Sequence, residues 1–334
     1  MPRVDGRSLS KDDVRIAREL NELENGWDTP DYLKNKAGDY FTRAYQLKRT
    51  VKSTHNFAWF LFYHSGEEER GRQVQQQCLA LEPRSVYPYY QYGHMLWCHG
   101  RYGEAVPYFR AAYEREKDGP ILNNMGVCYT EEGDFTNAKA CFATVIEAGS
   151  DIDDKSTFNL ALTEYKLGNV DQAKRLADTL TSRTKEMTDV SPFDLAEHYL
   201  DLADLYFVLG EYRRSFECLS KQGFRWYSRP GDSRSYAIYV SDELLWRKWV
   251  HDAMEKRLES IAELSSNDVQ WSDWTDEEKQ ARVSEYQSEI EEWKKHLQNG
   301  FPEPTVDIID GRLRIADYRC TLFDCTEHQT REDD

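Results

Sequence analysis

The chain has 334 residues, of which 40% are hydrophobic and 31% charged, enough for a packed core beneath a large solvated surface. Its 43 Lys and Arg against 60 Asp and Glu give a formal charge of -17. This charge excludes partners such as nucleic acid or an anionic membrane surface and favours a basic protein or peptide. No apolar run is long enough for a membrane span or a secretory signal, so we expect a cytoplasmic protein.

The N-terminal part, residues 1–51, is predicted to be a helical cap followed by half a repeat. Residues 8–26 (SLSKDDVRIARELNELENG) have the pattern of a capped amphipathic helix. Residues 38–47 (GDYFTRAYQL) are similar to a later stretch, GDFTNAKACF, which belongs to the repeats described next. Pro30 interrupts the helix that would precede residues 38–47 in a complete unit, so only half a repeat is expected.

Residues 52–225 are predicted to form an array of repeats. Gly126 lies 33 residues after Gly93, and the neighbouring glycines, aromatics and alanines recur with the same shift. The two best-matched units contain Gly93, Gly100, Tyr102, Ala105 and Phe109, and then Gly126, Gly133, Phe135, Ala138 and Phe142. The outer units, at steps of 34, 35 and 42 residues, contain Trp59, Gly66, Gly71 and Cys78, then Ala161, Gly168, Ala173 and Ala177, then Ala203, Gly210, Ser215 and Leu219. The longest step predicts an insertion at residues 182–192.

Each unit is predicted to be a helical hairpin. It divides at its second glycine into two stretches of helical periodicity, and the glycine permits a tight turn between them. Small residues, such as Gly126 on the first helix and Ala138 on the second, would let the two backbones approach closely. One hairpin cannot bury its apolar face alone, so the units are expected to stack.

These intervals resemble those of the tetratricopeptide repeat, a family of 34-residue helix-turn-helix units, over about residues 52–222. The resemblance implies an all-α solenoid of about five units. In the first unit Trp59 stands where the family has a small residue. A degenerate sixth unit is expected where Ala237 lies 34 residues after Ala203, with Leu244 in place of the turn glycine.

The last part, residues 226–334, is predicted to be a helical appendage that ends in a small β element and an acidic tail. Residues 242–265 and 275–300 read as two long helices, the second beginning with a capping box. Its apolar residues recur at spacings of 3 and 4, so we expect it to pack on the preceding helix or on a partner chain. After these helices, residues 306–323 alternate around an Asp-Gly pair, which predicts a β-hairpin.

Motifs for catalysis, cofactors or metals are weak in this sequence. Cys320, Cys325 and His328 have a spacing compatible with zinc, but no fourth ligand stands at a recognisable position, so we predict no metal and no cofactor. The seven cysteines are an odd number and lie mostly in helical patterns, which fits reduced thiols. Five tryptophans in the last third favour a helical core, with a ligand-stacking surface as the alternative: Trp246, Trp249, Trp271, Trp274 and Trp293.

The resemblance also implies where a partner would bind. In this family the first helix of each unit lines a concave face that holds an extended peptide or a helix. The corresponding positions here are Tyr87, Tyr90, Gln91, His94, Asn123, Asn124, Lys155 and Asn159. Three amides, Gln91, Asn124 and Asn159, share one position in consecutive units. Such a ladder can donate to and accept from a peptide backbone, although simple surface polarity would produce the same pattern.

We therefore expect a non-catalytic protein-interaction module, an adaptor or scaffold that binds a peptide or helix in the groove of the array. One alternative is an acidic inhibitor, immunity-type protein or chaperone that wraps a single basic protein. A second alternative is an enzyme or regulator with its site in residues 226–334. Tight one-to-one binding would indicate the first alternative, and a bound cofactor the second.

Overall fold

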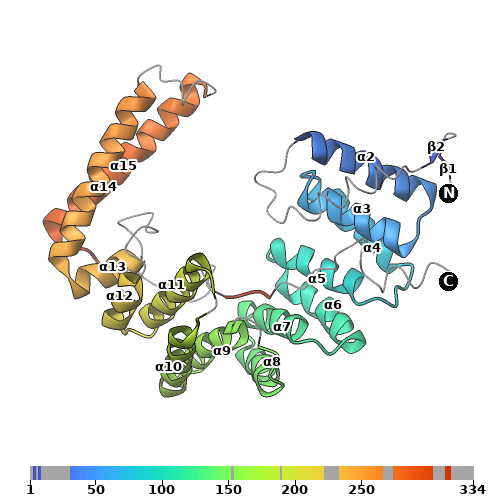
Figure 1. The fold of residues 1–334 in the computed structure, drawn as a ribbon, viewed down its shortest axis with the longest axis horizontal. Coiled ribbons are helices and arrows are strands. Elements are labelled where there is room, and N and C mark those ends of the chain that lie inside the picture. Colours follow the sequence, from blue (N-terminus) through green and yellow to red (C-terminus); the bar gives the residue numbers. More distant parts are fainter. Residues whose placement is uncertain are drawn as a thin grey trace. The chain divides into compact units, whose positions relative to one another are not determined.

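The computed structural model describes residues 3–4, 7–8, 31–151, 154–188, 190–221, 233–265, 274–303 and 313–316. Within these residues the protein is all-α, as predicted, apart from one antiparallel pair of two-residue strands, β1 (Arg3–Val4) and β2 (Arg7–Ser8) (Figure 1). The chain divides into two compact units, Met1–Asn159 with Arg314–Asp334, and Leu160–Leu313. The boundaries at residues 51 and 225 that the repeat pattern favours stay predictions.

In the first unit each helix packs on the next along the chain from α2 to α8. The helices are α2 (Asp31–Leu47), α3 (Val51–Tyr63), α4 (Glu68–Leu79), α5 (Tyr87–Cys98), α6 (Tyr102–Arg115), α7 (Gly119–Glu131), α8 (Phe135–Glu147) and the start of α9 (Lys155–Lys166). Gly100 and Gly133 lie in the turns of two hairpins with φ of 69° and 77°. This left-handed conformation suits glycine, so the predicted tight turns are confirmed.

In the second unit the helices after α9 also pack in sequence from α10 onward. They are α10 (Val170–Glu186), α11 (Pro192–Val208), α12 (Tyr212–Ser220), α13 (Ser233–Ser241), α14 (Glu243–Ser265) and α15 (Asp276–Asn299). The predicted insertion lengthens the helices beside it, because α10 and α11 have 17 residues each. Ser191 caps α11 by accepting the Asp194 N–H at 3.1 Å.

Close approach within the hairpins depends on the small residues of the first helices. A Cβ atom at Gly126 would lie 2.6 Å from Cε1 of Phe142, and one at Gly93 would lie 3.2 Å from the ring of Phe109. Both rings are fully buried. The aromatic side chains of α6 and α8 therefore fill the space that these glycines leave empty.

The first hairpin corrects the sequence alignment by one residue. Ala58, not Trp59, occupies the small-residue position, because a Cβ atom at Gly71 would lie 3.0 Å from the Ala58 carbonyl oxygen. Ala58 is completely buried, whereas Trp59 is partly exposed. The turn from Tyr63 to Glu68 is one residue longer than the turns of the following hairpins, and this extra residue shifts the register of α3.

The predicted N-terminal cap and half repeat stay predictions, and the structure describes only part of them. The cap helix predicted for residues 8–26 lies almost entirely outside the described residues. The half repeat is a single helix, α2, which starts directly after Pro30 and continues through Gly38. Gly38 therefore faces the ring of Phe60, where a Cβ atom would lie 2.9 Å from Cζ, and does not form a turn.

The two long C-terminal helices are confirmed. They are α14 and α15, which pack against each other, and the Thr275–Glu278 capping box opens α15 (Figure 1). Ala237, in the degenerate sixth unit, is fully buried. Leu244 is 81% exposed inside α14, because the turn falls two residues earlier, at Asp242. The predicted β-hairpin at 306–323 lies outside the described residues except for 313–316, which carry no strand assignment.

Replacing Gly126 with alanine should lower the free energy of unfolding by about 1–3 kcal/mol, because the added methyl group overlaps the Phe142 ring. Denaturant unfolding measures this loss. The same substitution in a Phe142→Leu background should cost less, since the smaller side chain leaves room. Equal costs in the two backgrounds would contradict the proposed close approach.

Candidate functional site

Two of the three predicted ladder amides hold the backbone of the chain's own residues Arg314–Ala316, here called the C-terminal segment (red in Figure 1). Asn159 Nδ2 donates to the Arg314 carbonyl oxygen at 2.7 Å, and Asn159 Oδ1 accepts from the Arg314 N–H at 2.8 Å. Asn124 forms the same pair with Ala316, at 2.8 Å and 2.7 Å. We call Asn124 and Asn159 the amide ladder.

This pairing is the one that a neighbouring β-strand would make. In extended backbone the N–H and C=O of one residue point to the same side, and those of the residue two positions later do so again. Arg314 and Ala316 therefore both face the ladder, whereas Ile315 between them does not bond to it. Each ladder amide takes the place of one residue of such a strand, and we call an amide together with the residue that it binds a rung. The segment needs no particular side chain for these four hydrogen bonds.

A second set of polar groups holds the ladder in place. Asn123 Nδ2 donates to the Arg314 carbonyl oxygen at 3.0 Å, and its own Oδ1 accepts from Ser156 Oγ at 2.9 Å. The Tyr90 hydroxyl donates to the Ala316 carbonyl oxygen at 3.0 Å and accepts from Asn124 Nδ2 at 2.8 Å. These side chains lie on α5, α7 and α9, so three consecutive first helices converge on three residues of backbone.

The ladder is buried and uncharged. Asn124 and Asn159 have no exposed surface, and Asn123 is 1% exposed. A buried amide that loses its partners costs about 1–3 kcal/mol, so the ladder needs a bound backbone to satisfy it. Two side chains of the segment add contacts: the Arg314 guanidinium lies 4.9 Å from the centre of the Phe158 ring, and Ala316 is 95% buried, with a relative exposure of 5%.

Gln91 has the predicted position but a different role. Its Nε2 donates to Gln75 Oε1 at 3.2 Å and reaches the His55 carbonyl oxygen at 3.5 Å. Gln75 in turn donates to the Pro88 carbonyl oxygen at 2.8 Å. The Gln91 amide therefore ties α5 to α3 and α4, within the array.

The other candidates lie on the same helices. Tyr87 and Lys155 are half-buried in the first turns of α5 and α9. His94 Nδ1 forms a hydrogen bond of 2.6 Å with the Tyr63 hydroxyl, which connects α5 to the end of α3. As a binding site for a partner protein, the eight predicted residues stay a prediction.

Sequence reasoning missed Asn56, Ser156 and Phe158. Asn56 lies two residues before Ala58, the spacing that also separates each ladder amide from its small residue. The one-residue error in α3 concealed this match. The Asn56 side chain is 5% exposed, and its Oδ1 has no hydrogen-bond partner among the residues that the structure describes. Phe158 directly precedes Asn159, and an aromatic residue at that position could have indicated a contact with a side chain of the bound segment.

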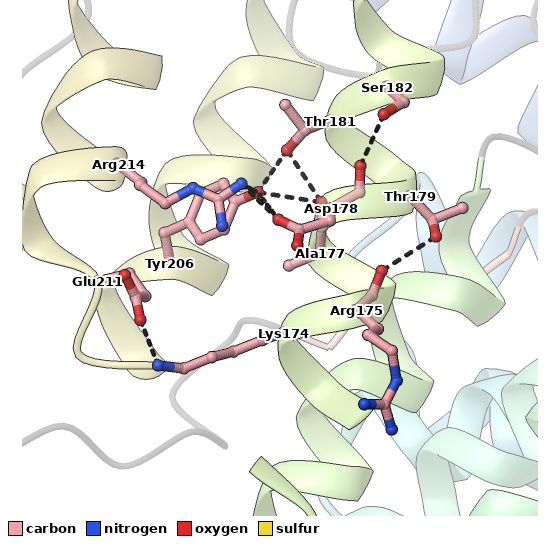
Figure 2. A network of polar contacts seen from close by, with 10 residues as sticks. All are labelled: Lys174, Arg175, Ala177, Asp178, Thr179, Thr181, Ser182, Tyr206, Glu211 and Arg214. Atoms are coloured by element: carbon pink, nitrogen blue, oxygen red, sulfur yellow. Dashed lines mark hydrogen bonds and ion pairs between the residues drawn. The ribbon is translucent and has the colours of Figure 1, made fainter. Parts of the chain in front are cut away.

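A second polar cluster joins α10, α11 and α12 (Figure 2). Arg214 Nη2 donates to Asp178 Oδ1 and to the Tyr206 hydroxyl, both at 2.5 Å, and its guanidinium lies over the Tyr206 ring. The Tyr206 hydroxyl also bonds to Thr181 Oγ1 at 2.6 Å. Burial raises the pKa of Tyr206 to about 12. Each of these groups bonds to another member of the cluster, so the cluster is a structural connection between helices.

Side chains that could ligate a metal ion are scattered in the described part of the chain. Its His, Cys, Asp and Glu side chains form no group suited to a metal ion, and the candidate Cys320, Cys325 and His328 lie outside it. Trp246 is fully buried and donates to Ser235 Oγ at 2.9 Å, and Trp293 is 3% exposed, so both belong to the helical core. Trp271 is not among the described residues. Over the described ranges, every helix is too short or too polar to cross a membrane.

The comparisons with known proteins agree with the repeat pattern. The family model for the tetratricopeptide repeat matches residues 86–118 and 119–148. No curated protein sequence matches the chain. A crystal structure of a tetratricopeptide repeat protein from Parabacteroides merdae ATCC 43184 has a TM-score of 0.50 at 14% identity, and the match covers 81% of this chain and 99% of that one. This likeness shows the fold.

Two further structures have lower scores. Yeast Tom70 has a TM-score of 0.49 at 14% identity, over 85% of this chain and 60% of the Tom70 chain. A chain of the APC/C hetero-tetramer Cut9-Hcn1 has a TM-score of 0.45 at 17% identity, over 70% of this chain and 46% of that one. This chain thus spans less than two thirds of both proteins.

Residue-resolved hydrogen exchange should show an alternation along the C-terminal segment. The Arg314 and Ala316 amides should be protected, because each donates to a ladder oxygen, whereas the Ile315 amide, which has no acceptor among the described residues, should exchange fast. Asn124→Leu should abolish the protection of Ala316, and Gln280→Ala, on the exposed surface of α15, should not. Uniform exchange at all three residues would contradict the pairing.

Tyr206 should make stability depend on pH above 10. Its raised pKa of about 12 means that the folded chain holds this proton where the unfolded chain releases it, so its contribution is complete below pH 10 and is lost between about pH 10 and 12. Tyr206→Phe should cost about 1–3 kcal/mol at pH 8. The difference from wild type should shrink as the pH rises to 12. A difference that stays constant, as expected for the exposed control Tyr32→Phe, would contradict this prediction.

Proposed function

Because this chain is a tetratricopeptide repeat protein, with repeats recognised at residues 86–118 and 119–148, we propose that it is a non-catalytic module that binds a partner protein. The partner contributes an extended segment, which lies along the first helices α5, α7 and α9. Its backbone pairs with the amide ladder, as strand addition does at the edge of a sheet. In the cell the module acts as an adaptor or scaffold.

One observation supports this proposal above the others. Asn124 and Asn159 each bind both backbone groups of one residue, and the two residues that they bind are two positions apart. Surface polarity alone would not align two amides with the repeat of an extended chain. The pair is suited to polypeptide backbone as a class of ligand, because its donors and acceptors match those of every residue except proline.

We further propose that the partner is basic. The formal charge of -17 attracts a positively charged protein over distances comparable to the Debye length. Phe158 provides a specific place for one cation, since the Arg314 guanidinium already lies over its ring. Contact of a cation with an aromatic ring contributes about 0.5–1 kcal/mol at exposed sites and more when water is excluded.

The chemistry of the ladder favours binding over catalysis. Its polar groups are amides and hydroxyls, which hold a peptide in place and do not ionise near neutral pH. Two tryptophans of residues 226–334, Trp246 and Trp293, are buried in the helical core and give no support to the alternative of an enzyme with its site there. The proposal includes a cytoplasmic location, which the free thiols of Cys78, Cys128 and Cys141 support.

A matched pair of variants tests this function by affinity capture from the cells that make the protein. Asn124→Leu with Asn159→Leu removes all four ladder bonds and keeps the same branched side-chain shape, and Gln280→Ala changes an exposed amide on α15. Capture of the partner should fall about tenfold or more with the ladder variant, because several hydrogen bonds of about 1 kcal/mol each are lost. It should be unchanged with the control.

Circular dichroism and thermal unfolding must first show that both variants are folded. A partner captured equally by wild type and by the folded ladder variant would overturn the proposal. The stoichiometry separates the remaining alternatives within this function. A single basic partner bound tightly and one-to-one would indicate an inhibitor or immunity-type protein, whereas several partners with a common segment would indicate an adaptor.

A further inference from the structure

We propose that the C-terminal segment is an internal ligand that the partner must displace, and that the partner segment carries a basic residue followed two positions later by a small one. This inference rests on the proposed function. It identifies the chemistry of the partner from the residues that occupy the ladder in the chain itself. It also makes binding competitive with a segment of the same molecule.

The first step is the occupancy of the ladder. At both rungs the amide nitrogen and the amide oxygen are bonded to the segment, and the neighbouring groups of Asn123 and Tyr90 bond to the same two carbonyl oxygens. A second backbone cannot add to these bonds. A partner that binds the ladder must therefore displace Arg314 and Ala316. Its own backbone then forms with the ladder the same hydrogen bonds that the segment loses.

The second step is the pattern of side chains. The residue at the Asn159 rung extends its guanidinium over Phe158, which favours Arg or Lys. The residue at the Asn124 rung is buried beside the Tyr90 hydroxyl, with Ala316 as a whole 5% exposed, which favours Ala, Ser or Gly. Ile315 between them is half-buried and makes none of the four ladder hydrogen bonds, so the ladder itself sets no requirement at that position.

The third step is direction. The segment passes from α9, at Arg314, to α7 and α5, at Ala316. A partner in the same register would follow this course from its N-terminal to its C-terminal end, against the order of the helices in the chain. The pattern is thus a basic residue at α9 and a small residue at α7.

The fourth step is the strength of competition. The segment belongs to the same molecule as the ladder, so it competes at an effective concentration that a dissolved peptide rarely reaches. A peptide that matches the segment should therefore bind weakly to the wild type. Weakening the internal copy should make the ladder available without any change to the ladder itself.

The test uses the full chain and a fluorescent peptide with the sequence of residues 311–318, GRLRIADY. Ala316→Pro in the chain removes the N–H that donates to Asn124, at a position outside any helix or strand. Fluorescence anisotropy should show that the peptide binds this variant at least about tenfold more tightly than wild type. Arg314→Glu in the chain, which keeps the backbone bonds and removes the cation from Phe158, should act in the same direction more weakly.

Two controls locate the binding. Adding Asn124→Leu to the Ala316→Pro chain should abolish the gain, and a peptide with proline at the position of Ala316 should not bind. Replacing the arginine of the peptide that corresponds to Arg314 should weaken binding more with Glu than with Lys. Equal affinity for wild type and the Ala316→Pro chain would overturn the inference, and so would no binding to either folded protein.

The captured partner distinguishes failure of this inference from failure of the proposed function. If capture depends on Asn124 and Asn159 but is the same for wild type and Ala316→Pro, the function stands and the internal ligand is wrong. If capture does not depend on the ladder, the proposed function fails, and the peptide assay still reports whether the segment can be replaced.

Discussion

The close approach of the two helices in each hairpin is the constraint on which the rest of the structure depends. Where Gly93 and Gly126 meet buried aromatic rings, the first helix is held at a fixed depth and rotation against the second. The ladder amides stand two residues before such small residues, so the same packing that stabilises the hairpin also determines where Asn124 points. The position of the amide ladder on the first helices therefore follows from the packing of the hairpins.

The ladder holds backbone through neutral groups, so its own hydrogen bonds depend little on pH or salt. Amides and hydroxyls keep their donors and acceptors over the whole physiological range, whereas a carboxylate or an ammonium group would add screening and desolvation terms. Charge enters at one place, the contact between Arg314 and the ring of Phe158. Backbone bonds thus set the register of the segment, and the Arg314 side chain adds its contact with the Phe158 ring.

Local signals in the sequence predicted most of the fold, and long-range contacts were beyond them. The turn glycines and the Thr275–Glu278 capping box are determined by bonds within a few residues, and they appear in the structure where expected. The register of α3 was wrong because one extra turn residue leaves both helical patterns intact. The position of Asn124 and Asn159 on one face followed from the repeat. The segment that they hold lies 155 residues after Asn159 and is bound through its backbone, which has no side-chain signature in a sequence.

The first compact unit is discontinuous, since Arg314–Asp334 belong with residues 1–159 and the second unit lies between them in the sequence. A ribosome that synthesises this chain releases the ladder helices long before it releases the residues that satisfy them. During that interval Asn124 and Asn159 have no internal backbone to hold, and closing the loop afterwards costs only a slowly growing entropy. The nascent chain therefore carries unsatisfied amides at Asn124 and Asn159 until Arg314 and Ala316 have left the ribosome.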